Sequence, residues 1–297
     1  MWPDQLWKKL ADPYIRRRVL IERLAEPLHL NALSALVALF GSTRAKIDYD
    51  LILRPYHAAS ILRAADIVRQ MGLAGLTVLE FGVASGTGLL NMCRVAELVS
   101  AETGVQIRIA GFDTGSGMPR PIDHRDHPEL YREGDYPMPD RQALVRSLPP
   151  NAQLVLGDLD KTIPAFLETV TDQAPIGFIS IDVDYYSSTR QALQIAAAGQ
   201  PTKLLPTTLV YLDDVLAVEH NRWCGELLAV QEFNAEHRLR KIEPFTALRP
   251  HRIFQRATWL DHMYVLHVLD HPRRQTIERG EGPRSVLPNP YLASPAR

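Results

Sequence analysis

A glycine-rich segment between a predicted strand and a predicted helix limits the possible folds of this chain more than any other feature. Residues 76–79 form a short apolar run typical of a buried strand, and residues 89–98 show the apolar spacing of a helix. Between them lies the sequence Glu80-Phe81-Gly82-Val83-Ala84-Ser85-Gly86-Thr87-Gly88. Glycine lets a backbone approach a ligand closely, and the first turn of a helix offers unpaired N–H groups. The segment therefore predicts one half of a nucleotide-type binding site.

The glycine spacing alone leaves other interpretations open. The same three glycines occur in short-chain dehydrogenases, and a tight strand–helix turn can exist without any ligand. Short-chain dehydrogenases usually carry this turn near the N-terminus and use a Tyr-x-x-x-Lys pair. In this chain the first glycine of the turn is Gly82, and no tyrosine is followed by a lysine four positions on. The dehydrogenase interpretation is therefore disfavoured.

Two further predicted strands lead to an acidic residue. Residues 105–112 are followed by Asp113, 25 positions after Gly88, close to where a Rossmann-like sheet places an acid on the ribose hydroxyls. A carboxylate suits that task because it accepts two hydrogen bonds from a cis-diol. Residues 152–156 lead to Asp158. For both acids the alternative is a turn or helix-capping role.

Four more acids follow the fourth and fifth predicted strands: Asp182 and Asp184, then Asp213 and Asp214. Parallel strands open on the same edge of a sheet, so these carboxylates are expected to converge. Several carboxylates cannot all ionise close together without a counter-charge, and a divalent cation supplies one. Oxygen-only ligands favour Mg²⁺, Mn²⁺ or Ca²⁺ over zinc. The alternative is that these acids cap helices on the surface.

The order of the elements predicts an α/β fold: a Rossmann-like, doubly wound and mainly parallel sheet. A C-terminal antiparallel hairpin is expected from two later apolar stretches, residues 252–254 and 263–269. Strands are predicted near 76–82, 105–112, 152–156, 176–182 and 207–212, and helices near 86–101, 140–148, 160–170, 187–199 and 222–237.

The chain is predicted to divide into an N-terminal helical extension (1–72), a main domain (73–271) and a surface or disordered tail (272–297). The extension is expected to cap the sheet, cover the substrate site or form a homo-oligomer contact. Its helices are predicted over residues 14–26, 30–40 and 57–71. The irregular insert at 114–140 follows the second strand and is interpreted as a functional lid.

Composition excludes several classes of partner. The 33 basic and 34 acidic residues nearly balance, so no nucleic-acid partner is expected. No uncharged stretch reaches the roughly 20 residues of a membrane span, and no signal peptide is evident. Cys93 and Cys224 have neither disulfide nor metal spacing and are expected to be small buried residues. Together these features predict a cytoplasmic protein.

The glycine segment resembles motif I of class I S-adenosylmethionine (SAM) methyltransferases. The two acid clusters, Asp182-x-Asp184-x-Tyr186-x-Ser188-Thr189 and Asp213-Asp214, resemble the macrocin O-methyltransferase group over about residues 76–240. This resemblance implies metal ligands at Asp182, Asp213 and Asp214, with Asp184 as a further ligand or general base. It implies SAM binding at Glu80, Gly82, Ser85, Gly86, Gly88, Asp113 and Asp158, the last near the adenine edge.

The resemblance implies an O-methyltransferase that uses SAM and Mg²⁺ (or Mn²⁺) to methylate a hydroxyl of a small sugar or natural-product acceptor. Asp184, or His220 beyond the second cluster, is the expected proton acceptor; the alternative for His220 is a surface or capping role. The group's usual phrase Ser-Phe-Glu-Gly-Leu-Pro is replaced by Thr114-Gly115-Ser116-Gly117-Met118-Pro119, which lacks its acid. Two other functions stay open: a metal-independent methyltransferase with a nitrogen or carboxyl acceptor, and a non-catalytic SAM- or metal-binding regulatory protein.

Overall fold

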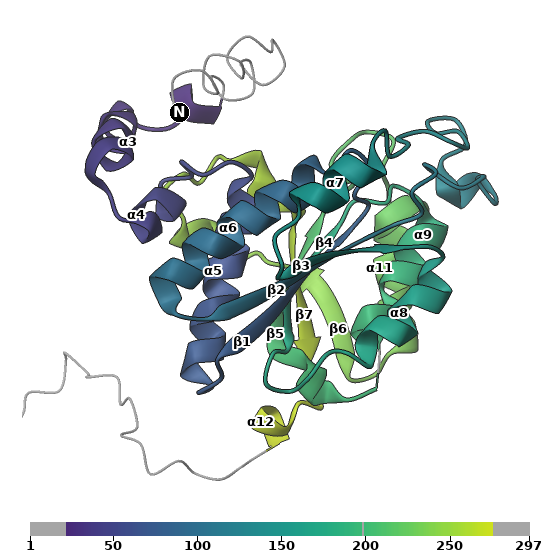
Figure 1. The fold of residues 1–297 in the computed structure, drawn as a ribbon. Coiled ribbons are helices and arrows are strands. Elements are labelled where there is room, and N and C mark those ends of the chain that lie inside the picture. The colour runs from purple at the N-terminus through teal and green to yellow at the C-terminus, as the bar shows by residue number, and fades with distance from the viewer. Residues whose placement is uncertain (1–21, 198, 276–297) are drawn as a thin grey trace, which may run out of the picture.

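The computed structural model describes residues 22–197 and 199–275 and places one seven-stranded sheet between two layers of helices (Figure 1). The strands are β1 (Gly75–Phe81), β2 (Gln106–Asp113), β3 (Ala152–Leu156), β4 (Ile176–Ile181), β5 (Leu204–Leu212), β6 (Arg240–Pro244) and β7 (Met263–Val268). The helices are α3 (Leu28–Phe40), α4 (Thr43–Asp48), α5 (Pro55–Gln70), α6 (Thr87–Thr103), α7 (Arg141–Ser147), α8 (Leu159–Leu167), α9 (Tyr186–Ala192), α10 (Gln194–Ala197), α11 (Gly225–Glu236) and α12 (Pro272–Gln275).

The strand order is β3-β2-β1-β4-β5-β7-β6. Strands β1 to β5 run parallel, and β7 runs antiparallel to both of its neighbours, β5 and β6. The predicted Rossmann-like fold with a C-terminal antiparallel pair is therefore confirmed. The chain builds outward from β1 to β3 and then returns to the other side of β1 with β4. Such a reversal opens a crevice at the carboxyl ends of the strands, where ligands of α/β proteins bind.

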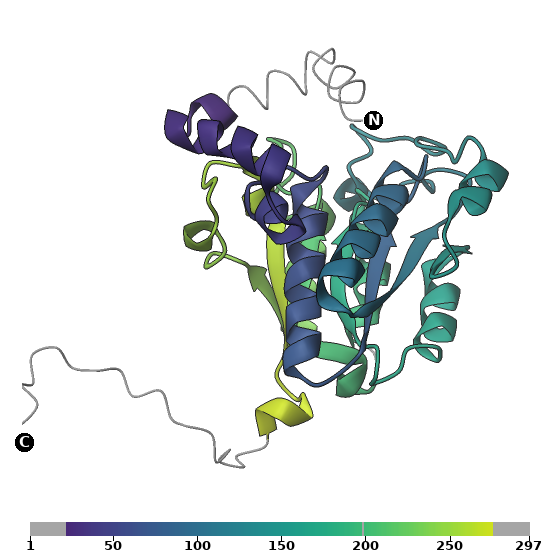
Figure 2. The same ribbon diagram turned by 60° about the vertical axis from the view of Figure 1, so that its left-hand side comes forward.

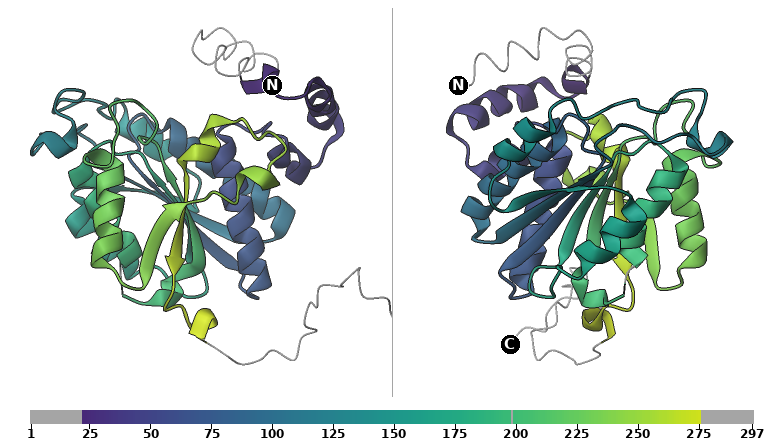
Figure 3. Two further views of the ribbon diagram at one scale, coloured as in Figure 1. Left: turned by 180° about the vertical axis from the view of Figure 1, so that it is seen from behind. Right: turned by 45° about the vertical axis from the view of Figure 1, so that its right-hand side comes forward.

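Strand β1 is buried on both faces, and its side chains alternate between two cores. Leu76 and Val78 pack with residues of α5 and α6, whereas Leu79 and Phe81 pack with residues of α8 to α11. Figures 2 and 3 show these two helical layers on opposite faces of the sheet. This double burial explains why the strand is a nearly continuous apolar run, as is typical of parallel sheets.

The antiparallel pair uses a different first strand from the predicted one. Residues 252–254 are not a strand, and Arg240–Pro244 pairs with β7 instead. The Arg252 guanidinium donates to the Asp50 carboxylate and to the Ile47 carbonyl, which draws its segment towards α4. The edge strand β6 was missed because Ile242 is the one apolar residue among Arg240–Lys241–Ile242–Glu243. The helix predicted at 187–199 is divided into α9 and α10.

Helix α5 is part of the helical layer on the sheet, although the sequence-based division assigned it to the N-terminal extension. Its apolar face contributes Ala58, Ile61, Leu62, Ala65 and Val68 to the core. The boundaries predicted at residues 72 and 271 stay predictions. The parts of the predicted segments at 14–21 and 276–297 lie outside the described residues.

Helix α3 lies beside the body of the molecule (Figure 1). Leu33, Leu36, Leu39 and Phe40 are exposed, whereas Ser34 is buried. A homo-oligomer formed through the N-terminal helices stays a prediction. Within the part of the chain that the structure describes, no helix has the length and apolar content needed to cross a membrane.

Candidate functional site

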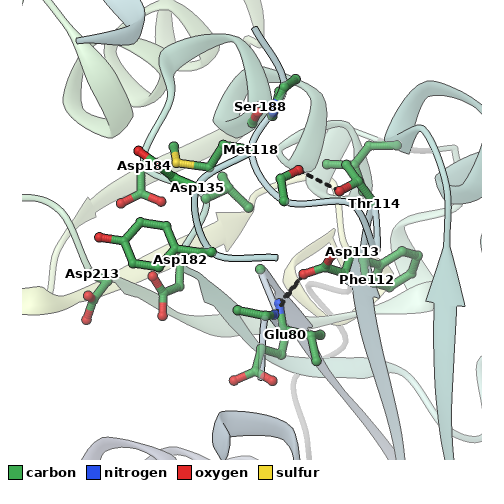
Figure 4. Close-up of a pocket in the computed structure, with 18 of the residues that line it drawn as sticks. Glu80, Phe112, Asp113, Thr114, Met118, Asp135, Asp182, Asp184, Ser188 and Asp213 are labelled. Atoms are coloured by element: carbon green, nitrogen blue, oxygen red, sulfur yellow. Dashed lines mark hydrogen bonds between the residues drawn. The ribbon is translucent and has the colours of Figure 1, made fainter. Parts of the chain in front are cut away.

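A cavity of about 790 Å³ opens at the carboxyl ends of the parallel strands, in the crevice that the strand order creates. Its walls come from the glycine turn after β1, the ends of β2 to β5 and the insert after β2. Figure 4 shows Asp182, Asp184 and Asp213 gathered in one part of the cavity and Asp113 in another. Of the twelve residues predicted for the site from the sequence, only Gly86 and His220 are not among those that line it.

The glycines of the turn make room for the protein's own atoms. Gly82 has φ +87°, and a Cβ added to it would lie 1.7 Å from the backbone oxygen of Asp182. A Cβ on Gly88 would lie 2.0 Å from Glu80 Oε1. Gly86 caps α6 with φ +84°, and its Cβ position is filled by Leu144 of α7. Gly82 therefore allows β1 and β4 to meet at the switch point, and Gly88 allows Glu80 to lie beneath the turn.

Asp113 fastens the glycine turn to the end of β2. Its Oδ2 accepts hydrogen bonds from the Val83 and Ala84 amides, at 2.9 and 2.8 Å, and its Oδ1 accepts one from the Gly115 amide. Ser85 is exposed, and its hydroxyl lies 3.0 Å from the Thr87 hydroxyl. A carboxylate has about four acceptor positions, so Asp113 keeps capacity for a ligand. Its predicted role on a ribose stays a prediction.

Asp158 performs the capping role that was the alternative for it. Its Oδ1 accepts from the Asp160 amide at the start of α8, at 3.1 Å. The same side chain is exposed and lines the cavity. The contact with an adenine edge therefore stays a prediction.

Glu80 is a buried carboxyl group without a full set of partners. Its exposed fraction is 2%, and Oε2 has no hydrogen-bond partner within the described structure. Burial raises the pKa of Glu80 to about 8; the negative charges of Asp182 and Asp113 act in the same direction, and Arg54 opposes them. A buried acceptor of this kind fits a cationic or hydrogen-donating ligand group.

Asp182, Asp213 and Asp214 converge on one point. One oxygen from each lies within 4.8 Å of the others. Burial, together with the charges of Asp213 and Asp184, raises the pKa of Asp182 well above its ordinary value. Burial and the neighbouring carboxylates raise the pKa of Asp214 to about 9. Three converging carboxyl groups, of which Asp182 and Asp214 resist ionisation without a counter-charge, are the donor set of a hard divalent cation.

Neighbouring side chains hold these acids in place. The Tyr211 hydroxyl donates to Asp213 Oδ1 at 2.6 Å. The Asp214 amide donates to Glu226 Oε2 at 3.0 Å, while Asp214 Oδ2 is buried with no hydrogen-bond partner among the described residues. That unpaired oxygen fits a missing electropositive partner.

Asp184 and His220, the two predicted proton acceptors, occupy different places. Asp184 lines the cavity with φ +58°. Burial raises the pKa of Asp184, and the neighbouring Asp214 carboxyl group and Tyr131 hydroxyl act against that effect. His220 lies behind the cluster, with Nε2 3.7 Å from Asp214 Oδ1. Burial lowers the pKa of His220, and His127 adds to that effect. Asp184 is therefore better placed to meet a substrate.

The insert after β2 forms one wall of the cavity, with Met118, Tyr131, Asp135 and Tyr136. It is tied to the domain by Asp126, which is fully buried. The Asp126 carboxylate accepts from the Ser187 amide (2.8 Å), the Ser187 hydroxyl (3.0 Å) and the Ile122 amide (2.9 Å). The sequence placed this insert, with Tyr131 in it, at the rim of the sheet but gave no role to Tyr131 or Asp126.

The Asp126→Ala variant is expected to loosen the insert without affecting the opposite end of the cavity. The substitution removes the shared acceptor of three partly buried hydrogen bonds, and hydrogen bonds to a charged group are worth roughly 1.5–3 kcal/mol each. We expect faster proteolysis within residues 118–136 in this variant than in the wild type. Asp123→Ala is the matched control, because the hydrogen bonds of the Asp123 carboxylate go to the neighbouring Arg125 and do not reach the rest of the domain. Equal protection of both variants from protease would contradict the anchoring role.

No protein-family model matches the sequence, and no curated protein matches it. Solved structures with a similar chain path include CalS11, a calicheamicin methyltransferase, at 21% identity and TM-score 0.44 over 69% of this chain and 81% of that chain. CmcI, in a Mg-SAM form, has 16% identity and TM-score 0.35 over 69% of each chain. MycE, in complex with Mg, SAH and mycinamycin VI, has 12% identity and TM-score 0.36 over 69% of this chain and 48% of that chain. Values this low do not decide an activity, so the function is inferred from the side chains of the site.

Proposed function

We propose that this protein is a SAM-dependent, divalent-metal-assisted O-methyltransferase that acts on a hydroxyl group of a small polar acceptor. One observation carries this proposal: a single cavity joins the glycine turn and buried Glu80 to the carboxylates of Asp182, Asp213 and Asp214. A Rossmann-like turn fits a nucleoside ligand, and the carboxylates fit a hard cation.

The residues of the first half of the cavity fit SAM. Glu80 offers a buried carboxylate for its ammonium group, and Asp113 keeps capacity for its ribose. The amides of the turn are already held by the Asp113 carboxylate, so this wall is organised before a ligand arrives. SAM supplies a methyl group on a sulfonium, which is already activated for transfer.

Asp182, Asp213 and Asp214 would hold the cation, which we take to be Mg²⁺ or Mn²⁺. A cation at this place supplies Lewis acidity that lowers the pKa of an acceptor hydroxyl. The Tyr211 hydroxyl donates a hydrogen bond that keeps Asp213 Oδ1 oriented, and the Glu226 carboxylate accepts one from the Asp214 amide and so fixes that backbone.

Asp184 is the proposed general base. It lines the same cavity as Asp182, Asp213 and Asp214, so its carboxylate can reach an acceptor hydroxyl there. It takes the proton of the acceptor hydroxyl while the oxygen forms its bond to the methyl carbon and the carbon–sulfur bond breaks. S-adenosylhomocysteine and the methyl ether leave. Because the donor is activated, positioning by the cavity walls supplies much of the rate.

Two measurements test this proposal. Mass spectrometry of the purified protein is expected to find SAM or S-adenosylhomocysteine, and calorimetry is expected to show a Mn²⁺ site that Mg²⁺ competes for. SAM binding without a cation site would favour the metal-free methyltransferase with another acceptor. A protein that binds both but transfers no methyl group to any hydroxylated acceptor would favour the regulatory function.

Cation affinity is expected to fall as the pH is lowered from 9. Without a cation the pKa of Asp214 is about 9, so below that pH binding must displace a proton. Each displaced proton makes the apparent Kd for Mn²⁺ about tenfold weaker per pH unit, and Asp182, whose pKa is also raised, can add to the proton release. Calorimetry at pH 6.5, 7.5 and 8.5 in buffers of different ionisation enthalpy would measure both the affinity and the proton release.

The same acid makes the stability of the metal-free protein depend on pH. A carboxyl group with a raised pKa in the folded state stabilises the fold below its ordinary pKa near 4, and that contribution is lost as pH rises towards 9. The Tm of EDTA-treated protein is therefore expected to fall between pH 6 and 9, and Mn²⁺ is expected to restore it most at pH 9. A rise in Tm on adding Mn²⁺ that is equal at pH 6 and pH 9 would contradict the assignment of Asp214 as a cation ligand.

A further inference from the structure

Arg54 is a charged cavity residue that the proposed chemistry leaves without a task. It lines the cavity together with Glu80, although it lies in the N-terminal part of the chain, directly before α5. We propose that Arg54 binds the carboxylate of the methionine end of SAM while Glu80 binds its ammonium group. The two side chains together then recognise an α-amino acid. This inference rests on the proposed function, because SAM is the ligand that brings both charges.

Glu80 supplies the hydrogen-bond acceptor of this site. The side chain is almost fully buried, lines the cavity, and has no hydrogen-bond partner for Oε2 among the described residues. Gly88 provides the space that Glu80 occupies. A carboxylate held in this way is costly unless a donor meets it, and an ammonium group is such a donor.

The Arg54 half has unused donors. The guanidinium group has five N–H donors. Among the described residues its one hydrogen-bond partner is the Tyr56 hydroxyl, 2.7 Å from Nη1. The remaining N–H donors form a planar fork that can bind both oxygens of a carboxylate, which the ammonium group of a lysine cannot do in the same way.

The position of Arg54 is fixed by a strained backbone and an aromatic stack. Arg54 has φ +53° and ψ +71° directly before Pro55, a left-handed conformation that is unfavourable for a residue preceding proline. The Tyr56 ring, whose hydroxyl accepts from Arg54, stacks on Tyr211 with centroids 3.8 Å apart and planes 6° apart. Strain of this kind persists where the surroundings enforce it, and it is common at ligand sites.

The two charges influence each other without forming a direct pair. Arg54 lowers the pKa of Glu80 against the stronger effect of burial. No ion pair within 4.0 Å joins the two described side chains. Because the two opposite charges line one cavity without pairing with each other, one can bind the carboxylate and the other the ammonium group of a zwitterion. The competing explanation is that Arg54 serves only as a counter-charge for Glu80 and Asp182.

A comparison of SAM with decarboxylated SAM tests the assignment by binding alone. Calorimetry on the full-length protein would measure both ligands with wild type, Arg54→Met, Arg54→Lys and Arg120→Met. Arg120 also lines the cavity but is exposed, so it controls for the general loss of a cavity charge. Arg54→Lys keeps the positive charge but lacks the planar pair of N–H donors. It replaces Arg54→Met as the test variant if Arg54→Met does not fold.

Wild type and Arg120→Met are expected to prefer SAM over decarboxylated SAM by roughly 10- to 100-fold, the scale of hydrogen bonds to a charged group. Arg54→Met is expected to reduce that preference to within about threefold, and Arg54→Lys to an intermediate value. A wild-type preference that survives in Arg54→Met would overturn the inference, as would equal binding of both ligands by wild type while SAM binding itself stands. Failure of wild type to bind either ligand would overturn the proposed function and this inference with it.

Discussion

Replacing Asp213 and Asp214 together by asparagine is expected to weaken Mn²⁺ binding by at least about 100-fold and to abolish methyl transfer, while SAM affinity stays within a few fold. One oxygen of each acid lies within 4.8 Å of the others and of Asp182. Asparagine keeps the size and one oxygen but removes the two charges that a hard cation requires. Loss of the Lewis acid alone removes several kcal/mol of transition-state stabilisation.

The double variant also has an expected effect on stability that separates charge from packing. Burial and mutual repulsion raise the pKa of Asp214 to about 9, so its ionised form destabilises the metal-free fold. The variant is therefore expected to melt at a higher temperature than EDTA-treated wild type at pH 8.5. Asp158→Asn is the matched control, since Asp158 lines the same cavity outside the cluster and asparagine also caps helices. Tight Mn²⁺ binding by the double variant would remove the cation site from these residues.

The Gly82→Ala variant is expected to lose at least about 100-fold in SAM affinity and more than about 3 kcal/mol of unfolding free energy. Its Cβ would lie 1.7 Å from the Asp182 backbone oxygen, so β1 and β4 would have to separate at the switch point. The added cost of φ +87° is only about 1 kcal/mol. Changes that separate secondary-structure elements belong to the most destabilising class of substitution.

Gly104→Ala provides the control for backbone strain. Gly104 ends α6 with φ +75°, and an added Cβ would have no atom within 4 Å. The control is therefore expected to cost about 1 kcal/mol and to leave SAM affinity unchanged. Chemical denaturation and calorimetry measure both effects. Similar losses in both variants would show that conformational strain, and not the approach of Asp182, makes Gly82 necessary.

The sequence was sufficient for the sheet because its parallel strands are apolar runs followed by glycine or acidic residues. β1 is buried on both faces, and such a strand is recognisable without an alignment. The edge strand β6 was missed because an edge strand with a single apolar residue has almost no hydrophobic pattern. The apolar stretch at residues 252–254 led to a wrong strand prediction because Arg252 and Phe254 contact Ile47 of α4 and Tyr49 just after it. Arg252 and Ile47 are 205 positions apart, so this contact leaves no local signal in the sequence.

Sequence-based prediction of the candidate site has the same limit: contacts between distant parts of the chain leave no local signal. The acids of the two clusters could be grouped because adjacent parallel strands end at one edge, and the structure brings Asp182, Asp213 and Asp214 together. The space beside Gly86 is filled by Leu144, a contact that the sequence did not indicate, and its predicted contact with SAM stays a prediction. Arg54 could not be found, because its approach to Glu80 depends on how α5 packs on the sheet. His220 lies near the acids in sequence but behind Asp214 in space.

The most direct test of a shared SAM and cation site uses SAM labelled with ¹³C in the transferred methyl group. Mn²⁺ in the cluster of Asp182, Asp213 and Asp214 is expected to broaden the methyl resonance of enzyme-bound SAM strongly, because both ligands occupy one cavity. The Asp213→Asn/Asp214→Asn variant is expected to bind SAM with a sharp methyl signal at the same Mn²⁺ concentration, and excess Mg²⁺ is expected to sharpen the wild-type signal. A methyl resonance of bound SAM that Mn²⁺ leaves unchanged in the wild type would contradict the account.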